Sequence, residues 1–169
     1  EIPETRWDWK AFYGDPLTEA GKTSIKHGGF IDGVDEFDPA FFGITPREAK
    51  MMDPQVRLLL TYIWKALEDS CLTREDLSAR KTGVYIAAGR SEYMTLFKNP
   101  EEDPLNVLSA ISSMIPNRIS HFFNLHGPSE YCETACSSAL VALHNAVKAI
   151  SLNECEQAVI GAVNLLLSP

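Results

Sequence analysis

Apolar residues recur with a helical period in one stretch of the first half of the chain. The apolar positions are Val56, Leu59, Leu60, Ile63 and Leu67. Spacings of three and four residues place such side chains on one face of a helix. Asp53 and Pro54 stand just before the pattern, where an aspartate can cap free amides and proline gives up no intrahelical bond. The pattern therefore predicts an amphipathic helix from residue 54 to about residue 69.

Three short runs are predicted to be strands. Residues 82–89 and 157–163 are β-rich and end in small residues, and residues 129–134 are short and extended in character. A short helix opened by Pro116 is expected over about residues 115–123. Residues 136–150 are apolar on almost every face, and a helix of that kind must be buried. A buried helix between strands predicts a layered α/β architecture with a sheet on at least one side.

The N-terminal segment differs from the rest. Residues 1–35 are polar and have no sustained period, although tryptophan, phenylalanine and tyrosine gather in residues 7–13. We expect residues 1–27 to form an irregular arm that packs through its aromatic rings. The length of 169 residues suggests a single domain.

Charge and hydropathy exclude several classes of function. The chain carries 23 acidic and 15 basic residues, a formal charge of −8, and no block of lysine and arginine. This argues against binding to the phosphate backbone of nucleic acids. No apolar run approaches the roughly 20 residues that cross a bilayer, and the first residues lack the features of a secretory signal. We expect a cytoplasmic protein without a membrane partner.

The four cysteines are Cys71, Cys132, Cys136 and Cys155. They form no CxxC pair and no paired spacing with histidine, so neither a metal site nor a disulfide framework is indicated. In a reducing cytosol, a functional cysteine is expected to act as a nucleophile.

Cys136 has the sequence context of such a nucleophile. It stands where a predicted strand turns into a helix, between the small residues Ala135 and Ser137, and larger neighbours would block the bend or cover the sulfur. Free amides and the positive end of the helix dipole favour the thiolate there. The backbone amide of Cys136 could also stabilise an oxyanion, so the position suits acyl transfer from a thioester. The alternative is an ordinary core cysteine, which is common at the start of an apolar helix.

Several segments resemble the β-ketoacyl synthase domains of modular polyketide synthases. Residues 134–138 read Thr-Ala-Cys-Ser-Ser and are followed by Ala-Leu-Val-Ala-Leu-His, which is similar to the active-site signature of that family. Glu133 and Ala139 depart from it, since aspartate and serine are more usual there. Further matching segments, in the family's order, are residues 29–32, 34–49, 52–60, 116–120 and 161–165. Residues 6–9 and 22–29 resemble the subtype that receives its acyltransferase in trans.

The resemblance implies a thiolase-like fold, layered α/β/α, in which residues 1–169 form the N-terminal part of a ketosynthase domain and the half that contains the nucleophile. It implies that Cys136 takes up an acyl group from the phosphopantetheine arm of an acyl carrier protein, as the first stage of decarboxylative Claisen condensation. No cofactor is then bound directly. It also implies a homodimer, with the strand over about residues 129–132 at the dimer seam.

The resemblance further implies two catalytic histidines in C-terminal motifs that this sequence lacks. The C-terminal half of the ketosynthase would be needed to supply them. The local histidines are poor substitutes, because His144 follows Cys136 by eight residues, about 80° around an ideal helix and two turns along it. His27, His121 and His126 lie in polar surroundings.

Two other functions stay open. The chain could be a non-condensing fragment for carrier docking or structure, with a cysteine that at most accepts acyl groups. It could also be a cysteine hydrolase, which would need a histidine within hydrogen-bond reach of Cys136.

Overall fold

The structure is a computed structural model that describes residues 1–90, 92–97 and 111–169. It contains two compact units. The first unit comprises residues 1–34 and 166–169, and the second comprises residues 35–165. No glycine-rich or proline-rich linker in the sequence marks this division.

The first unit has little regular structure. Its one short helix is the 3₁₀ turn η1 (Trp9–Ala11), and an isolated bridge pairs Tyr13 with Thr23. Ring contacts supply much of its packing: the ring centroids of Trp9 and Tyr13 lie 5.7 Å apart, and those of Trp7 and Phe30 lie 6.0 Å apart.

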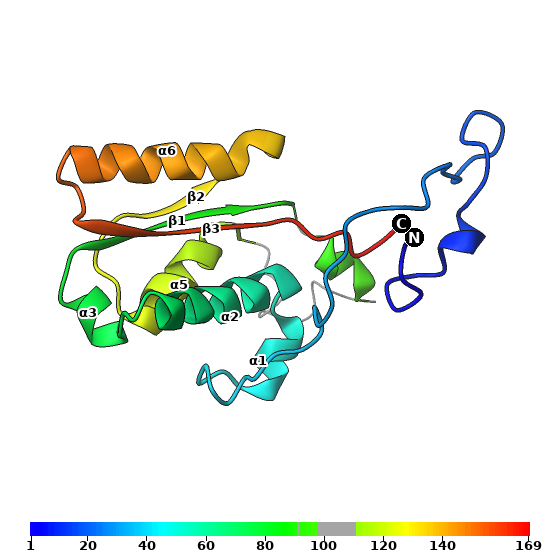
Figure 1. The fold of residues 1–169 in the computed structure, drawn as a ribbon. Coiled ribbons are helices and arrows are strands. Elements are labelled where there is room, and N and C mark those ends of the chain that lie inside the picture. The colour runs from blue at the N-terminus through cyan, green and yellow to red at the C-terminus, as the bar shows by residue number, and fades with distance from the viewer. Residues whose placement is uncertain (91, 98–110) are drawn as a thin grey trace. The chain divides into compact units, whose positions relative to one another are not determined.

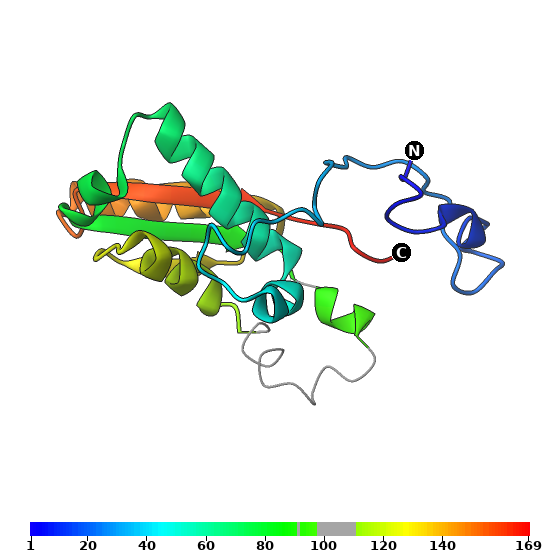
Figure 2. The ribbon, with the colours of Figure 1, turned by 90° about the horizontal axis from the view of Figure 1, so that it is seen from below.

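The second unit is built on a parallel sheet of three strands in the order β2-β1-β3. The strands are β1 (Thr82–Ala88), β2 (Ser129–Cys132) and β3 (Gln157–Val163). All three strands were predicted, although β1 ends one residue and β2 two residues before the predicted end, because Glu133 and Thr134 already lie in the connection to the next helix. Figure 2 shows β1 and β3 lying side by side.

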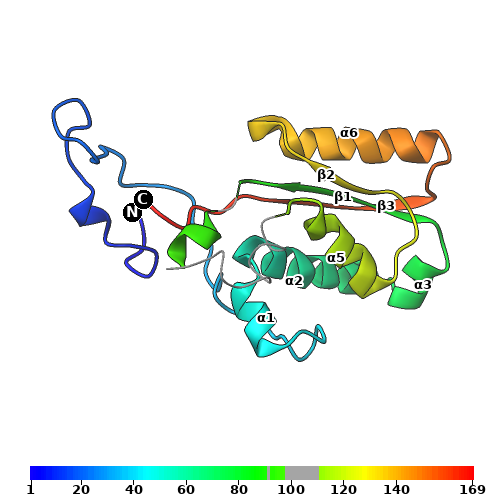
Figure 3. The same cartoon turned by 180° about the vertical axis from the view of Figure 1, so that it is seen from behind.

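Helices cover both faces of this sheet. Helices α2 (Pro54–Asp69) and α5 (Met114–Phe123) lie on one face, and α6 (Ser138–Ser151) lies on the other (Figures 1 and 3). Shorter helices among the described residues of this unit are α1 (Pro46–Met51), α3 (Arg74–Ser78), η2 (Tyr93–Leu96) and η4 (Ala135–Ser137). The second unit therefore has three layers, α/β/α. Among the residues described, no helix is both long and apolar enough to cross a membrane.

Helix α2 begins where its sequence predicts. The carboxylate of Asp53 accepts a hydrogen bond of 2.7 Å from the amide of Gln55, and Pro54 occupies the first helical position. The apolar face of α2 packs against β1 and α5 in the larger of two core clusters, in which Leu60, Ile86, Ile119 and Phe123 are fully buried.

Helix α6 contradicts one prediction. Its face toward the sheet is buried through Ala142, Ala146 and Ala149, whose small side chains let the helix lie close to the strands. Its other face is exposed, although the sequence predicted burial all round. The large apolar residues exposed on α6 are Leu140 (71%), Leu143 (45%), Val147 (55%) and Ile150 (41%). The prediction was wrong because the sheet covers only one side of the helix.

Tyr85 gives the fold a testable dependence on pH. Its ring is 1% exposed, and burial raises the pKa of its hydroxyl from 10.0 to about 12. The hydroxyl is buried without a hydrogen bond of normal geometry to any described residue. The nearby thiol of Cys155 is only a weak hydrogen-bond partner. The folded state therefore favours the neutral phenol, and this contribution to stability is complete below pH 10 and is lost as the pH rises toward 12.

We expect Tyr85→Phe to remove that loss. Urea unfolding at pH 8 and pH 11.5 should show a fall in the free energy of unfolding that is smaller in Tyr85→Phe than in the wild type, by about 2 kcal/mol. Tyr62→Phe is the matched control, since Tyr62 is 54% exposed. Equal falls in the wild type and Tyr85→Phe would contradict the assignment.

Candidate active site around Cys136

Cys136 lies in the 3₁₀ turn η4, directly between the end of β2 and the start of α6. Its side chain is exposed. The predicted strand-to-helix position of this cysteine is therefore correct. Neither Thr134 nor Ser137 makes a capping hydrogen bond with its side chain, and the amides of Ser137 and Ser138 donate to the carbonyls of Thr134 and Ala135.

Hydroxyl groups hold this turn in shape. Ser138 Oγ accepts a hydrogen bond of 2.7 Å from the Thr134 amide and donates one of 2.7 Å to the Ala135 carbonyl. Ser137 Oγ donates to the Thr134 carbonyl at 2.7 Å. Small size was the predicted reason for serine at these positions. The hydrogen bonds give a second reason, because they fix the backbone on both sides of Cys136.

The backbone just before Cys136 is strained. Ala135 has a φ of 54°, in the left-handed region that costs a residue with a Cβ atom on the order of 1–2 kcal/mol. Such strain persists only where the surrounding structure enforces it. Here the serine hydrogen bonds enforce it, and the resulting sharp bend leaves the Cys136 side chain exposed.

Cys136 lines a cavity of about 510 Å³ at the carboxyl ends of all three strands. Parallel strands with helices on both faces characteristically bind ligands at this edge. Most of the lining is small and apolar, with Ala87, Ala88, Gly89, Ala135, Ala139, Ala162 and Val163. The polar lining residues besides Cys136 are Arg90, Glu133, Ser138 and Asn164. The cavity thus presents the thiol of Cys136 to an apolar ligand.

Side chains from other elements hold the end of β1, which forms one wall of this cavity. The Tyr131 hydroxyl donates a hydrogen bond of 2.7 Å to the Ala88 carbonyl. The Gln55 side-chain amide donates one of 3.0 Å to the Gly89 carbonyl. Burial raises the pKa of Tyr131 above its usual value, so this phenol stays a hydrogen-bond donor at neutral pH.

The other cysteines have different surroundings. Cys132 is 6% exposed, and burial raises the pKa of its thiol, which disfavours the thiolate. Cys155 is also buried, whereas Cys71 is exposed after the end of α2. Of the four cysteines, all of which are described, only Cys136 lines the cavity at the strand ends.

No histidine accompanies Cys136. All four histidines are described and exposed, and none of them lines the cavity. His144 lies on α6 but not at the cavity, as its helical offset predicted. Among the described residues there is also no group of three or more histidine, cysteine, aspartate or glutamate residues that could hold a metal ion.

The walls of the cavity were not predicted from the sequence. Ala87 to Arg90 and Asn164 are far from Cys136 in sequence and meet it only because of the strand register, in which Ala87 pairs with both Cys132 and Ala162. The predicted strands carried part of this signal, because the carboxyl ends of neighbouring parallel strands meet at one edge of the sheet. The strand order was not predicted.

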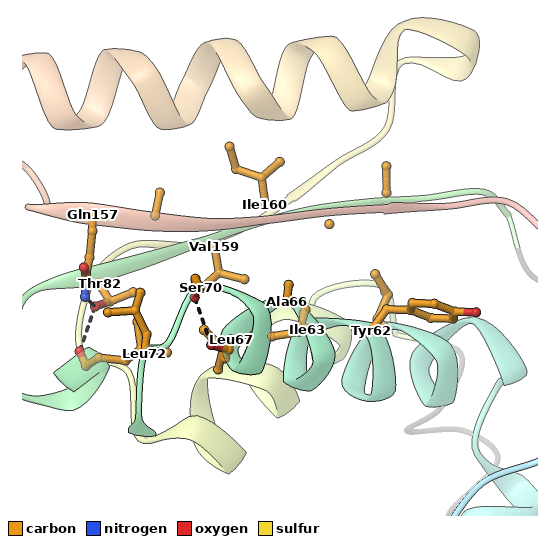
Figure 4. A pocket seen from close by; sticks show the side chains of 15 residues that line it. Tyr62, Ile63, Ala66, Leu67, Ser70, Leu72, Thr82, Gln157, Val159 and Ile160 are labelled. Atoms are coloured by element: carbon orange, nitrogen blue, oxygen red, sulfur yellow. Dashed lines mark hydrogen bonds between the residues drawn. The ribbon is translucent and has the colours of Figure 1, made fainter. Parts of the chain in front are cut away.

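A second cavity of about 510 Å³ lies between α2 and β3 (Figure 4). It is lined mainly by apolar side chains. Three of its polar side chains are hydrogen-bonded: Gln157 Nε2 donates to Thr82 Oγ1 at 2.8 Å, and Ser70 Oγ donates to the Leu67 carbonyl at 3.0 Å. It contains no nucleophile with a base among the residues that line it. The cavity at Cys136 is therefore the better candidate for chemistry.

Comparison with known proteins points to one family. Residues 1–169 match the N-terminal domain of β-ketoacyl synthases. The chain is 50% identical over 169 residues to the polyketide synthase PksN of Bacillus subtilis (strain 168), and 51% identical over 169 residues to PksR of the same strain. Both alignments cover the whole chain but only 3% and 6% of these relatives.

Solved ketosynthase structures resemble the fold closely. An oxazolomycin ketosynthase domain of Streptomyces albus JA3453 superposes with a TM-score of 0.88 at 38% identity, over 100% of this chain and 30% of that one. The ketosynthase from module 6 of the bacillaene synthase of Bacillus subtilis 168 gives a TM-score of 0.83 at 35% identity, over 99% of this chain and 27% of that one. The chain thus spans less than a third of the length of these ketosynthases.

Proposed function

This chain belongs to the β-ketoacyl synthase family, as its N-terminal domain, and from that premise we propose that Cys136 carries the growing acyl chain during polyketide elongation. The proposal rests on the position of Cys136 in the fold. An exposed thiol stands on a strained turn at the carboxyl ends of three parallel strands, in a cavity of small side chains. A covalent nucleophile needs this access to its substrate.

In the first step, the Cys136 thiolate attacks the carbonyl carbon of an acyl thioester. The bond from that carbon to the sulfur of pantetheine breaks, and the pantetheine sulfur leaves and takes up a proton. The acyl group is then a thioester of Cys136. The substrate arrives on the phosphopantetheine arm of an acyl carrier protein, so the domain itself needs no bound cofactor.

In the second step, a carrier-bound malonyl unit loses carbon dioxide, and the resulting enolate attacks the acyl group on Cys136. A carbon–carbon bond forms, and the bond to sulfur breaks to return the Cys136 thiolate. This step needs histidines, and none of the four in the chain lines the cavity. The C-terminal half of a ketosynthase would supply them.

Two surfaces of the second unit support the need for further protein. The exposed apolar face of α6, with Leu140, Leu143, Val147 and Ile150, is costly to leave in water. We infer that the C-terminal half covers it. Strand β2 is an edge strand of the sheet, and a free edge can pair with a second chain. This supports a homodimer formed along residues 129–132.

The alternative is a fragment that accepts acyl groups without condensing them, which the absence of histidine from the cavity lining would favour. A chase experiment separates the two functions. The natural polypeptide is loaded with an acyl pantetheine thioester, and malonyl carrier protein is then added. We expect the acyl group to leave Cys136 and to appear as a β-ketoacyl thioester on the carrier, with release of carbon dioxide. An acyl group that stays on Cys136 would favour the alternative.

A further inference from the structure

Gly89 and Asn164 lie against each other on one wall of the Cys136 cavity. A Cβ atom added to Gly89 would lie 2.1 Å from Oδ1 and 3.0 Å from Cγ of Asn164. The backbone does not require glycine here, because Gly89 is not among the residues with positive φ. Glycine at this position therefore serves the contact with Asn164.

Gly89 is held from two sides, so it cannot retreat from Asn164. Its amide donates a hydrogen bond of 2.9 Å to the carbonyl of Val163, the residue before Asn164. Its carbonyl accepts the 3.0 Å hydrogen bond from Gln55, whose side chain is 1% exposed and lies within 3.4 Å of Asp53 Oδ2. Moving the backbone of Gly89 would break at least one of these hydrogen bonds.

The side chain of Asn164 is the part that can move. Its amide makes no hydrogen bond to any residue in the described part of the chain, and the side chain is exposed within the cavity lining. The tip of a flexible side chain rotates at low cost, whereas the held backbone does not. Any side chain at position 89 would therefore turn the Asn164 amide away from its present position.

We propose that Asn164 is a specificity-determining residue for the acyl group, and that Gly89 leaves the space in which the Asn164 side-chain amide lies. With the amide against Gly89, the cavity admits acyl groups that branch near the thioester. When the amide is displaced into the cavity, narrow acyl groups are favoured. The inference rests on the proposed function, because it takes the cavity at Cys136 to be the acyl site.

The test compares loading of Cys136 by isobutyryl and acetyl pantetheine thioesters in the wild type, Gly89→Ala, Asn164→Ala and the double variant. We expect Gly89→Ala to lower the ratio of isobutyryl to acetyl kcat/KM about tenfold, because one or two methyl groups discriminate by about that much in a filled pocket. The double variant should restore the ratio, since the next atom, Cβ of residue 164, lies 3.5 Å from the new Cβ. Asn164→Ala alone should keep it at or above the wild-type value.

A purely structural role for Gly89 gives a different result. Gly89→Ala would then slow both acyl groups equally, and removing the Asn164 side chain would not rescue it, which would overturn the proposal. Wild-type protein that accepts neither thioester would instead contradict the proposed function. In that case the alkylation rates of Cys136 with iodoacetamide and with the bulkier N-ethylmaleimide still measure the cavity width. Gly89→Ala should slow the bulkier reagent more, and equal slowing would overturn the proposal.

Discussion

Replacing Cys136 by alanine should abolish acyl loading at this site and stop elongation that depends on it. The alanine variant has no atom that can form the thioester, and the loss of a covalent nucleophile lowers turnover by at least about 10³-fold. The side chain is exposed, so the variant should fold normally. The measurement is β-ketoacyl product formed from an acyl thioester and malonyl carrier protein.

Cys132→Ala is the matched control for this prediction. Cys132 stands four residues earlier, but its thiol is buried and its pKa is raised by that burial. We expect this variant to keep product formation within about threefold of the wild type, allowing for a small packing defect. Product formation that survives in Cys136→Ala and is lost in Cys132→Ala would show that the wrong thiol has been assigned.

The substitution Gly127→Ala should unfold much of the second unit. A Cβ atom on Gly127 would lie 2.4 Å from the carbonyl carbon and oxygen of Thr82 and 2.6 Å from the Gly83 nitrogen. These are backbone atoms at the start of β1, and the Gly127 amide already donates to the Thr82 carbonyl at 2.9 Å. Removing this clash would require β1 to move apart from the segment that leads into β2. We therefore expect a loss of about 3 kcal/mol or more in the free energy of unfolding.

Urea unfolding followed by circular dichroism measures that loss. Gly29→Ala is the control, since an added Cβ there meets no atom within 4 Å, and its effect should stay within about 0.5 kcal/mol. Gly127→Ala with the same stability as Gly29→Ala would mean that residue 127 does not approach β1 as described.

The sequence predicts the elements of the second unit well because local rules determine them. Helix α2 follows from its apolar period together with the cap at Asp53 and Pro54, and both features are present. The strands follow from short β-branched runs. The layered α/β/α fold of the thiolase-like class, expected from the resemblance around Cys136, is confirmed by the ketosynthase structures that superpose on the chain.

Burial around α6 could not be predicted in this way. The residues of α6 are apolar on nearly all sides, and this composition indicates what the helix prefers to contact, not what is present. The sheet packs against the face of α6 with Ala142 and Ala146, and the face with Leu140 and Val147 stays exposed. The failed prediction is itself informative, because it locates the surface on which we expect the C-terminal half to pack.

The candidate site was predicted in part. Local sequence placed Cys136 at its turn, because strand, small residues and helix follow one another without a gap. The contacts that shape the cavity are distant in sequence: Gly89 reaches Asn164 only through the pairing of β1 with β3. Residues that meet through strand order have no local signature, so they emerge only from the structure.

Peptide mapping after acyl loading shows which cysteine carries the acyl group. Trypsin should release residues 119–148 as one peptide, because no lysine or arginine lies between Arg118 and Lys148, and fragmentation of that peptide distinguishes Cys132 from Cys136. After the natural polypeptide is incubated with an acyl pantetheine thioester, we expect the mass of one acyl group on Cys136 and none on Cys132. An unmodified Cys136 in folded protein, or an acyl group on Cys132 instead, would show that Cys136 is not the nucleophile.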